Sequence, residues 1–79
     1  MTIKSELLVF PEGDAQDARV PLRINQIVDL NGYPIDIPLR SAKIIAYRVF
    51  KITKREDRGE ESTFYHLELV RRNEILEYM

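Results

Sequence analysis

The sequence of 79 residues contains no cysteine, three glycines and a single histidine, and each shortage excludes a class of site. Without cysteine the chain can form neither a disulfide bond nor a thiolate zinc site. All three glycines stand in expected turns, which leaves no glycine-rich loop to hold a phosphate. With one histidine and no thiolate, the donors for a specific transition-metal site are also missing. We therefore predict no metal and no cofactor.

Groups that could perform catalysis are equally scarce. Serine occurs only at positions 5, 41 and 62, and none has a GxSxG-like context. His66 lies in an alternating segment, where packing against an aromatic neighbour is a better interpretation than a general base, because a base needs an orienting partner and a cleft. The carboxylates near residue 57 indicate a solvated hairpin tip, and residues 11–17 (PEGDAQD) lack the alternating ligands and closing glutamate of a calcium loop. We predict that the protein is not an enzyme.

No apolar run approaches the ~20 residues of a membrane span, and the start of the sequence has no signal-peptide pattern. We expect a cytoplasmic protein with no membrane partner. A chain of 79 residues forms one domain, residues 1–79, and buries only about 60% of the surface that its unfolded form exposes. The stability margin is therefore expected to be small, and good packing or a partner chain must supply it.

Hydrophobic alternation predicts five strands joined by turns. The predicted strands are residues 4–10, 19–30, 33–39, 43–55 and 62–71. Residues 73–79 either extend the last strand or form a helical turn capped by Asn73, and the spacing of the apolar residues favours a short helix. The pattern predicts an all-β fold: a small five-stranded antiparallel barrel or a strongly bent sheet, of SH3-like or OB-like proportions, with two hairpins.

Asn31-Gly32 marks the first hairpin, because both residues accept the positive φ of a two-residue type I′ loop. Such a loop places Val28 opposite Ile35, so that the apolar faces of the two strands meet. The second hairpin is marked by Asp57-Arg58-Gly59, which has glycine at the third place of a three-residue loop. Both registers can therefore be predicted from the turns.

The register of the first hairpin explains its prolines. It directs the nitrogens of Pro34 and Pro38 away from the neighbouring strand. A proline is tolerated in a sheet where no ladder donor is needed, so residues 33–39 are predicted to be an edge strand that no further strand joins. Residues 4–10 then link the two hairpins, in the spatial order 3-2-1-5-4.

One face of the second hairpin carries an apolar cluster bordered by charge. In the predicted register the cluster consists of Phe50, Ile52 and Phe64. It is bordered by His66 and by Arg48, which has Glu68 opposite it, and these five residues, without Glu68, are the predicted partner-binding residues. The other face already supplies a core, so this cluster must be covered within the chain or by another protein. We predict a non-catalytic interaction module that binds protein, or a second copy of itself, through this hairpin.

The basic segment from residue 40 to residue 55 indicates an alternative function. The residues that would contact nucleic acid are Arg40, Lys43, Tyr47, Lys51, Lys54 and Arg55. Small β-barrels bind single strands through stacking and phosphate contacts of this kind. The net charge of -1 and the acids opposite these bases weaken the attraction for phosphate, so a nucleic-acid-binding barrel is the second prediction.

Overall fold

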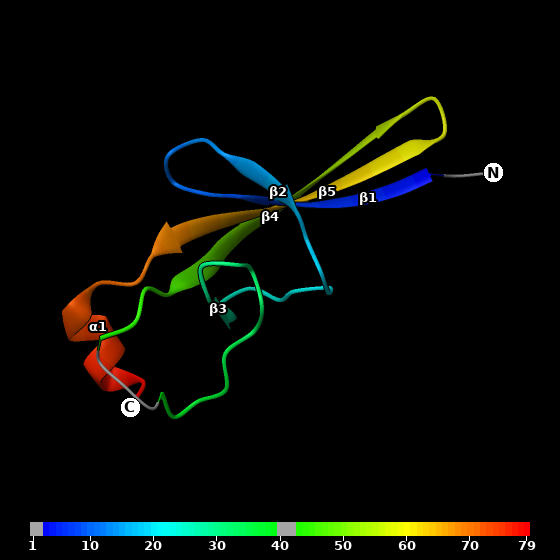
Figure 1. Cartoon of the computed structure of the whole chain (residues 1–79). Coiled ribbons are helices and arrows are strands. Elements are labelled where there is room, and N and C mark those ends of the chain that lie inside the picture. The colour runs from blue at the N-terminus through cyan, green and yellow to red at the C-terminus, as the bar shows by residue number, and fades with distance from the viewer. Residues whose placement is uncertain (1–2, 40–42) are drawn as a thin grey trace.

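The structure, a computed structural model, describes residues 3–39 and 43–79, and this part of the chain contains five strands and one short helix (Figure 1). The elements are β1 (Ile3–Val9), β2 (Ala15–Asp17), β3 (Ile27–Val28), β4 (Tyr47–Asp57), β5 (Glu60–Leu69) and α1 (Arg72–Glu77). The strands form one sheet in the order β2-β1-β5-β4-β3. This mixed sheet is bent into a half-barrel. The prediction of an all-β fold with a bent sheet and a short C-terminal helix is confirmed.

The predicted neighbours of β5, which are β1 and β4, are confirmed. The place of residues 19–30 and the direction of β1 differ from the prediction. Residues 19–30 do not lie beside β1; instead β3 pairs with β4, with Val28 opposite Tyr47. β1 takes the free edge of β5 and runs parallel to it, so the sheet is not wholly antiparallel. Leu8 of β1 and Val28 of β3 are both completely buried in one core cluster. Burial of these two side chains explains why β1 pairs with the edge of β5, and β3 with the edge of β4, near the core.

Most of the strand predicted at residues 19–30 is irregular. Asn25 has a φ of 70°, and the amide of Gln26 donates to the carbonyl of Arg23 at 3.1 Å, so the chain turns before β3 begins. Of the even-numbered apolar residues in this segment, only Leu22 and Val28 are buried. Alternation alone therefore overestimated the length of this strand.

The loop after β3 has three residues rather than the predicted two. The amide of Asp29 donates to the carbonyl of Tyr33 at 2.8 Å, and the carbonyl of Asp29 accepts from the amide of Gly32 at 3.0 Å. Within this loop only Gly32 has a positive φ, of 86°. The register shifts by one residue, so that Val28 faces Pro34 and the predicted register is wrong.

Residues 33–39 do not form the predicted edge strand, although the nitrogen of Pro34 points away from β3 as predicted. The ladder bonds on either side of Pro34 are made by the amides of Asp29 and Ile35, so none is needed from the proline. Beyond it the chain leaves the sheet, the peptide bond before Pro38 is cis, and the amide of Leu39 donates to the carbonyl of Tyr78 at 2.7 Å. This segment therefore lies against the C-terminal end of the chain.

The loop of the β4-β5 hairpin has two residues rather than the predicted three. Arg58 and Gly59 both have positive φ, of 47° and 84°, which is the requirement of a type I′ turn. The register near the tip is shifted from the predicted one, and a β-bulge at Phe50 restores it nearer the core. Arg48 consequently lies opposite Glu68, as predicted.

Two hydrophobic clusters lie on opposite faces of the sheet, and the second lies at the end of the sheet nearest α1. The first contains Leu8, Phe10, Leu22, Val28, Tyr47, Val49, Tyr65 and Leu67. The second contains Ile27, Leu39, Ala46, Val70 and Ile75. Because adjacent residues of a strand point to opposite faces, Ile27 and Val28 of β3 enter different clusters. The second cluster joins α1 to the sheet.

α1 is a short helix that begins after Arg71, whose φ and ψ of -74° and 159° are extended. The predicted cap at Asn73 is therefore wrong, since Asn73 lies inside the helix. Ile75 is its buried residue. Across residues 3–39 and 43–79, no helix is long and apolar enough to cross a membrane.

Candidate functional site

The β4-β5 hairpin beyond Val49 and the adjacent β1 project away from α1 and the C-terminus, and we call this projection the arm (Figure 1). In the arm Phe64 lies between Thr53 of β4 and Leu7 of β1, and His66 lies between Lys51 and Val9. Residues opposite one another in a sheet share a face. These side chains therefore lie on one face, opposite the first hydrophobic cluster, and we call it the outer face.

Apolar and aromatic side chains form the middle of the outer face. The ring centroids of Phe50 and His66 are 6.3 Å apart, so the bulge residue Phe50 belongs to this face. The Thr53 hydroxyl and His66 Nε2 are hydrogen-bonded at 2.9 Å, which holds the imidazole against the sheet. Phe50 is 50% exposed, and Phe64 is only partly buried. An exposed group of aromatic side chains of this kind can be desolvated by a second surface.

The opposite face of the arm is more polar. Lys4 Nζ lies 4.0 Å from a carboxylate oxygen of Glu61, and the Tyr65 hydroxyl donates to Glu6 at 3.1 Å. Burial raises the pKa of the Tyr65 phenol. Ile52 lies opposite Tyr65 and packs against the first hydrophobic cluster. The predicted placement of Ile52 beside Phe50 and Phe64 is therefore wrong, because the bulge reverses its direction.

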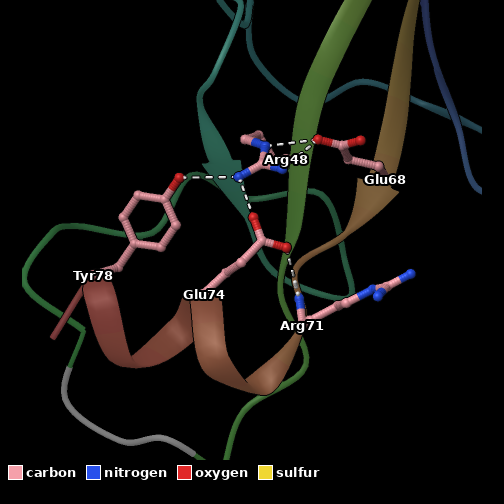
Figure 2. Close-up of polar contacts among 5 residues, drawn as sticks. All are labelled: Arg48, Glu68, Arg71, Glu74 and Tyr78. Carbon is pink, nitrogen blue, oxygen red and sulfur yellow. Dashed lines mark hydrogen bonds and ion pairs between the residues drawn. The ribbon is translucent and has the colours of Figure 1, made fainter.

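Arg48 marks the inner end of the outer face and makes four polar contacts inside the chain (Figure 2). Its Nε donates to Glu68 Oε1 at 2.7 Å, and its Nη2 donates to the same oxygen. Its Nη1 donates to Glu74 Oε2 at 2.8 Å and to the Tyr78 hydroxyl at 3.2 Å. One guanidinium from β4 thus joins a carboxylate on β5 to two side chains at the C-terminal end of the chain.

These contacts stabilise the charged forms of Arg48 and Glu74. The hydrogen bond with Tyr78, followed by those with Glu68 and Glu74, raises the pKa of Arg48 above its ordinary value. The hydrogen bond from Arg48 lowers the pKa of the Glu74 carboxyl. The Arg48 side chain is only 20% exposed. Arg48 therefore fastens α1 to the sheet and has few donors left for a partner.

The lowered pKa of Glu74 predicts a pH dependence. A carboxyl whose folded pKa lies below its unfolded value adds stability above the unfolded pKa, and this is lost as pH falls through the folded pKa. We expect the urea midpoint of the wild type to exceed that of Glu74→Gln at neutral pH and the two to converge below about pH 4. The exposed Glu77 of the same helix provides the control, because Glu77→Gln should not produce this convergence. A gap between wild type and Glu74→Gln that does not depend on pH would contradict the prediction.

The residues of the nucleic-acid prediction are dispersed. Tyr47 is buried in the first cluster, where burial and then the charge of Glu12 raise its phenol pKa. Lys51 and Arg55 lie on the outer face, whereas Lys54, opposite Thr63, lies on the other face. Lys43 lies before β4, near the second cluster, and Arg40 is outside the described residues. The bases of this prediction that lie in the arm are thus on both of its faces, and the aromatic residue predicted to stack with them is buried.

Sequence reasoning missed Leu7 and Val9 of the outer face, and Glu74 and Tyr78 of the Arg48 contacts. The alternation in residues 4–10 could have shown that Leu7 and Val9 share a face, and the predicted order placed this segment beside residues 62–71. Neither signal gave the parallel direction and the register that bring Leu7 to Phe64. In the part of the chain that the structure describes, no group of three or more acidic or histidine side chains could hold a metal ion.

A protein-family model described as Uncharacterised Treponema protein matches residues 2–78. No curated protein and no solved structure matches the chain. The match identifies a family and assigns no ligand, reaction or partner.

Proposed function

The chain belongs to the family of uncharacterised Treponema proteins, and we propose that it is a non-catalytic module that binds protein through the outer face of the arm. The observation that carries the proposal is the position of Phe50, Phe64 and His66 on one face, beside Leu7 and Val9. Aromatic side chains are enriched in protein interfaces, because each buries a large area and loses little conformational entropy when it is fixed.

The two ends of the sheet support this choice of surface. Near α1, the face that carries Ala46 and Val70 is covered, because Ile75 packs there in the second cluster. Beyond Arg48 the same face continues into the arm, where Phe50 remains half exposed. The sheet thus has an intramolecular cover on one half of this face only. A protein partner would cover the other half of this face.

Nucleic acid is not included in the proposal. Affinity for single strands depends on bases and aromatic rings that act on one surface. Tyr47 is buried, and Lys51 and Lys54 point to opposite faces. Protein binding depends on the apolar and aromatic side chains of the outer face, and those are already together.

A photoreactive phenylalanine analogue at position 64 tests the proposal. Incubated with extract of the source cells and irradiated, the full chain should give discrete protein adducts, because the analogue lies in the bound surface. The same analogue in place of Lys54, on the opposite face of the same hairpin, should give few. Equal adducts from the two positions, or none from position 64, would refute binding through this face.

A further inference from the structure

We infer that the protein chain bound by the outer face is a second copy of this chain, an inference that rests on the proposed function. The first observation is the arrangement of charge at the borders of this face. Lys51 and Arg55 are exposed on β4, at one side of the apolar middle. Asp17 is exposed on β2, beside Leu7 at the other side. Along the apolar middle the face therefore has two bases on one side of β5 and an acid on the other, while Asp57 of β4 lies farther toward the hairpin tip.

A two-fold axis along β5 would bring unlike borders together. In a two-fold dimer each copy uses the same surface, so the surface must complement itself. Rotation about an axis parallel to β5 places β4 of one copy over β1 and β2 of the other. Across the sheet Asp17 is in register with Thr53, which lies between Lys51 and Arg55 along β4. Asp17 of one copy would therefore face both bases of the second copy.

The same charges disfavour the other simple arrangement. An axis across the strands at the level of Phe64 would place β4 over β4 and bring Lys51 of one copy to Arg55 of the other. Like charges at an interface oppose that alignment. In the favoured arrangement Phe64 and His66 of β5 lie at the centre of the interface, next to Phe64 and His66 of the second copy. Aromatic contact at the centre and unlike charge at the borders are the usual distribution in an interface.

The size of the face sets the expected strength. Four neighbouring strands about 4.8 Å apart give a face about 15 Å wide. The five residues from Lys51 to Arg55, at about 3.4 Å each, give it a length of about 17 Å, and hence an area of about 250 Å². This area is small beside the roughly 800 Å² per partner of a standard interface, so the dimer should be weak and reversible.

Sedimentation of the full chain from about 10 µM to about 1 mM tests the inference. The mean mass should rise from one chain toward two as concentration increases. Phe64→Asp should weaken the dimer at least about tenfold, because a carboxylate would be desolvated at its centre. Ile24→Asp, at an exposed apolar residue outside the arm, should leave it unchanged. Circular dichroism of each variant establishes that it is folded.

Charge reversal tests the axis. Asp17→Lys and Lys51→Glu should each weaken self-association, and an equimolar mixture of the two variants should associate more strongly than either alone. Their failure to restore one another would overturn the arrangement along β5. A chain that stays monomeric at every concentration, or a dimer that Phe64→Asp does not affect, would overturn self-association altogether. If position 64 still formed discrete adducts with other proteins, the proposed function would stand while this inference failed.

Discussion

Gly32→Ala should lower the free energy of unfolding by about 2–5 kcal/mol, from two separate causes. Gly32 has a φ of +86°, where a side chain costs about 1–2 kcal/mol. A Cβ at this position would also overlap Cδ1 of Leu8, which is completely buried. Overpacking of this kind costs about 1–3 kcal/mol. In a chain of this length the loss is a large fraction of the total stability, and urea unfolding followed by circular dichroism measures it.

Gly13 provides a matched control, because it has a φ of +99° but no atom lies within 4 Å of a Cβ built there. Gly13→Ala should therefore cost only the backbone strain of about 1–2 kcal/mol. Combining Gly32→Ala with Leu8→Val tests the contact itself. Removing the crowded methyl should make the double variant less unstable than the sum of the single ones. Equal costs for Gly32→Ala and Gly13→Ala would show that the Leu8 contact is unimportant.

Both hairpins could be located from the sequence, but their loop types could not. Asn31-Gly32 favours a two-residue loop, yet the Asp29 carboxylate accepts hydrogen bonds from the amides of Asn31 and Tyr33 at 2.8 and 2.9 Å. These bonds stabilise the three-residue loop. At the other hairpin Arg58 has positive φ, although arginine has no preference for it. The bulge at Phe50 shifts the register of β4 by one residue. With such a bulge, the alternation of apolar residues along the hairpin is compatible with a loop of two residues or of three.

The sheet order depends on contacts that no local pattern records. β2 consists of three exposed residues without apolar alternation, so nothing in Ala15–Asp17 indicates a strand. β1 has the predicted alternation, but that pattern is the same whether its neighbour is parallel or antiparallel. The all-β class and the existence of both hairpins needed only local signals. The order of the strands required knowledge of how distant segments pack.

The candidate site was also predicted only in part from the sequence. The sequence prediction correctly paired Arg48 with Glu68, because residues near the core keep the predicted register. It placed Ile52 on the outer face because a bulge at Phe50 has no signature in the residue types alone. Glu74 and Tyr78 reach Arg48 only through the path of the chain between β5 and α1. The sequence therefore predicted the contact of Arg48 with Glu68 but not its contacts with Glu74 and Tyr78.

Arg48→Met should destabilise the protein by about 2–3 kcal/mol and loosen α1. Breaking a fully buried ion pair from one side costs about 3–5 kcal/mol, and the partial exposure of Arg48 and its partners reduces this. Methionine keeps much of the apolar stem, so the loss comes chiefly from the charge and the hydrogen bonds. Without the guanidinium, Glu68 and Glu74 would remain close together as like charges with no cation between them. The side of α1 that carries Glu74 and Tyr78 would then be repelled or released from the sheet.

Hydrogen exchange and urea unfolding together distinguish this role from general destabilisation. Amides of α1 should exchange faster in Arg48→Met, while those of the β4-β5 ladder should change mainly through global unfolding. Lys54→Met on the same strand is the matched control, since Lys54 is exposed and lies on the face opposite the outer face. Adding Glu74→Gln to Arg48→Met should recover part of the lost stability, because it removes one of the two facing charges. No recovery in that double variant would mean that repulsion between the carboxylates does not account for the loss, and that Arg48 acts through its donors alone.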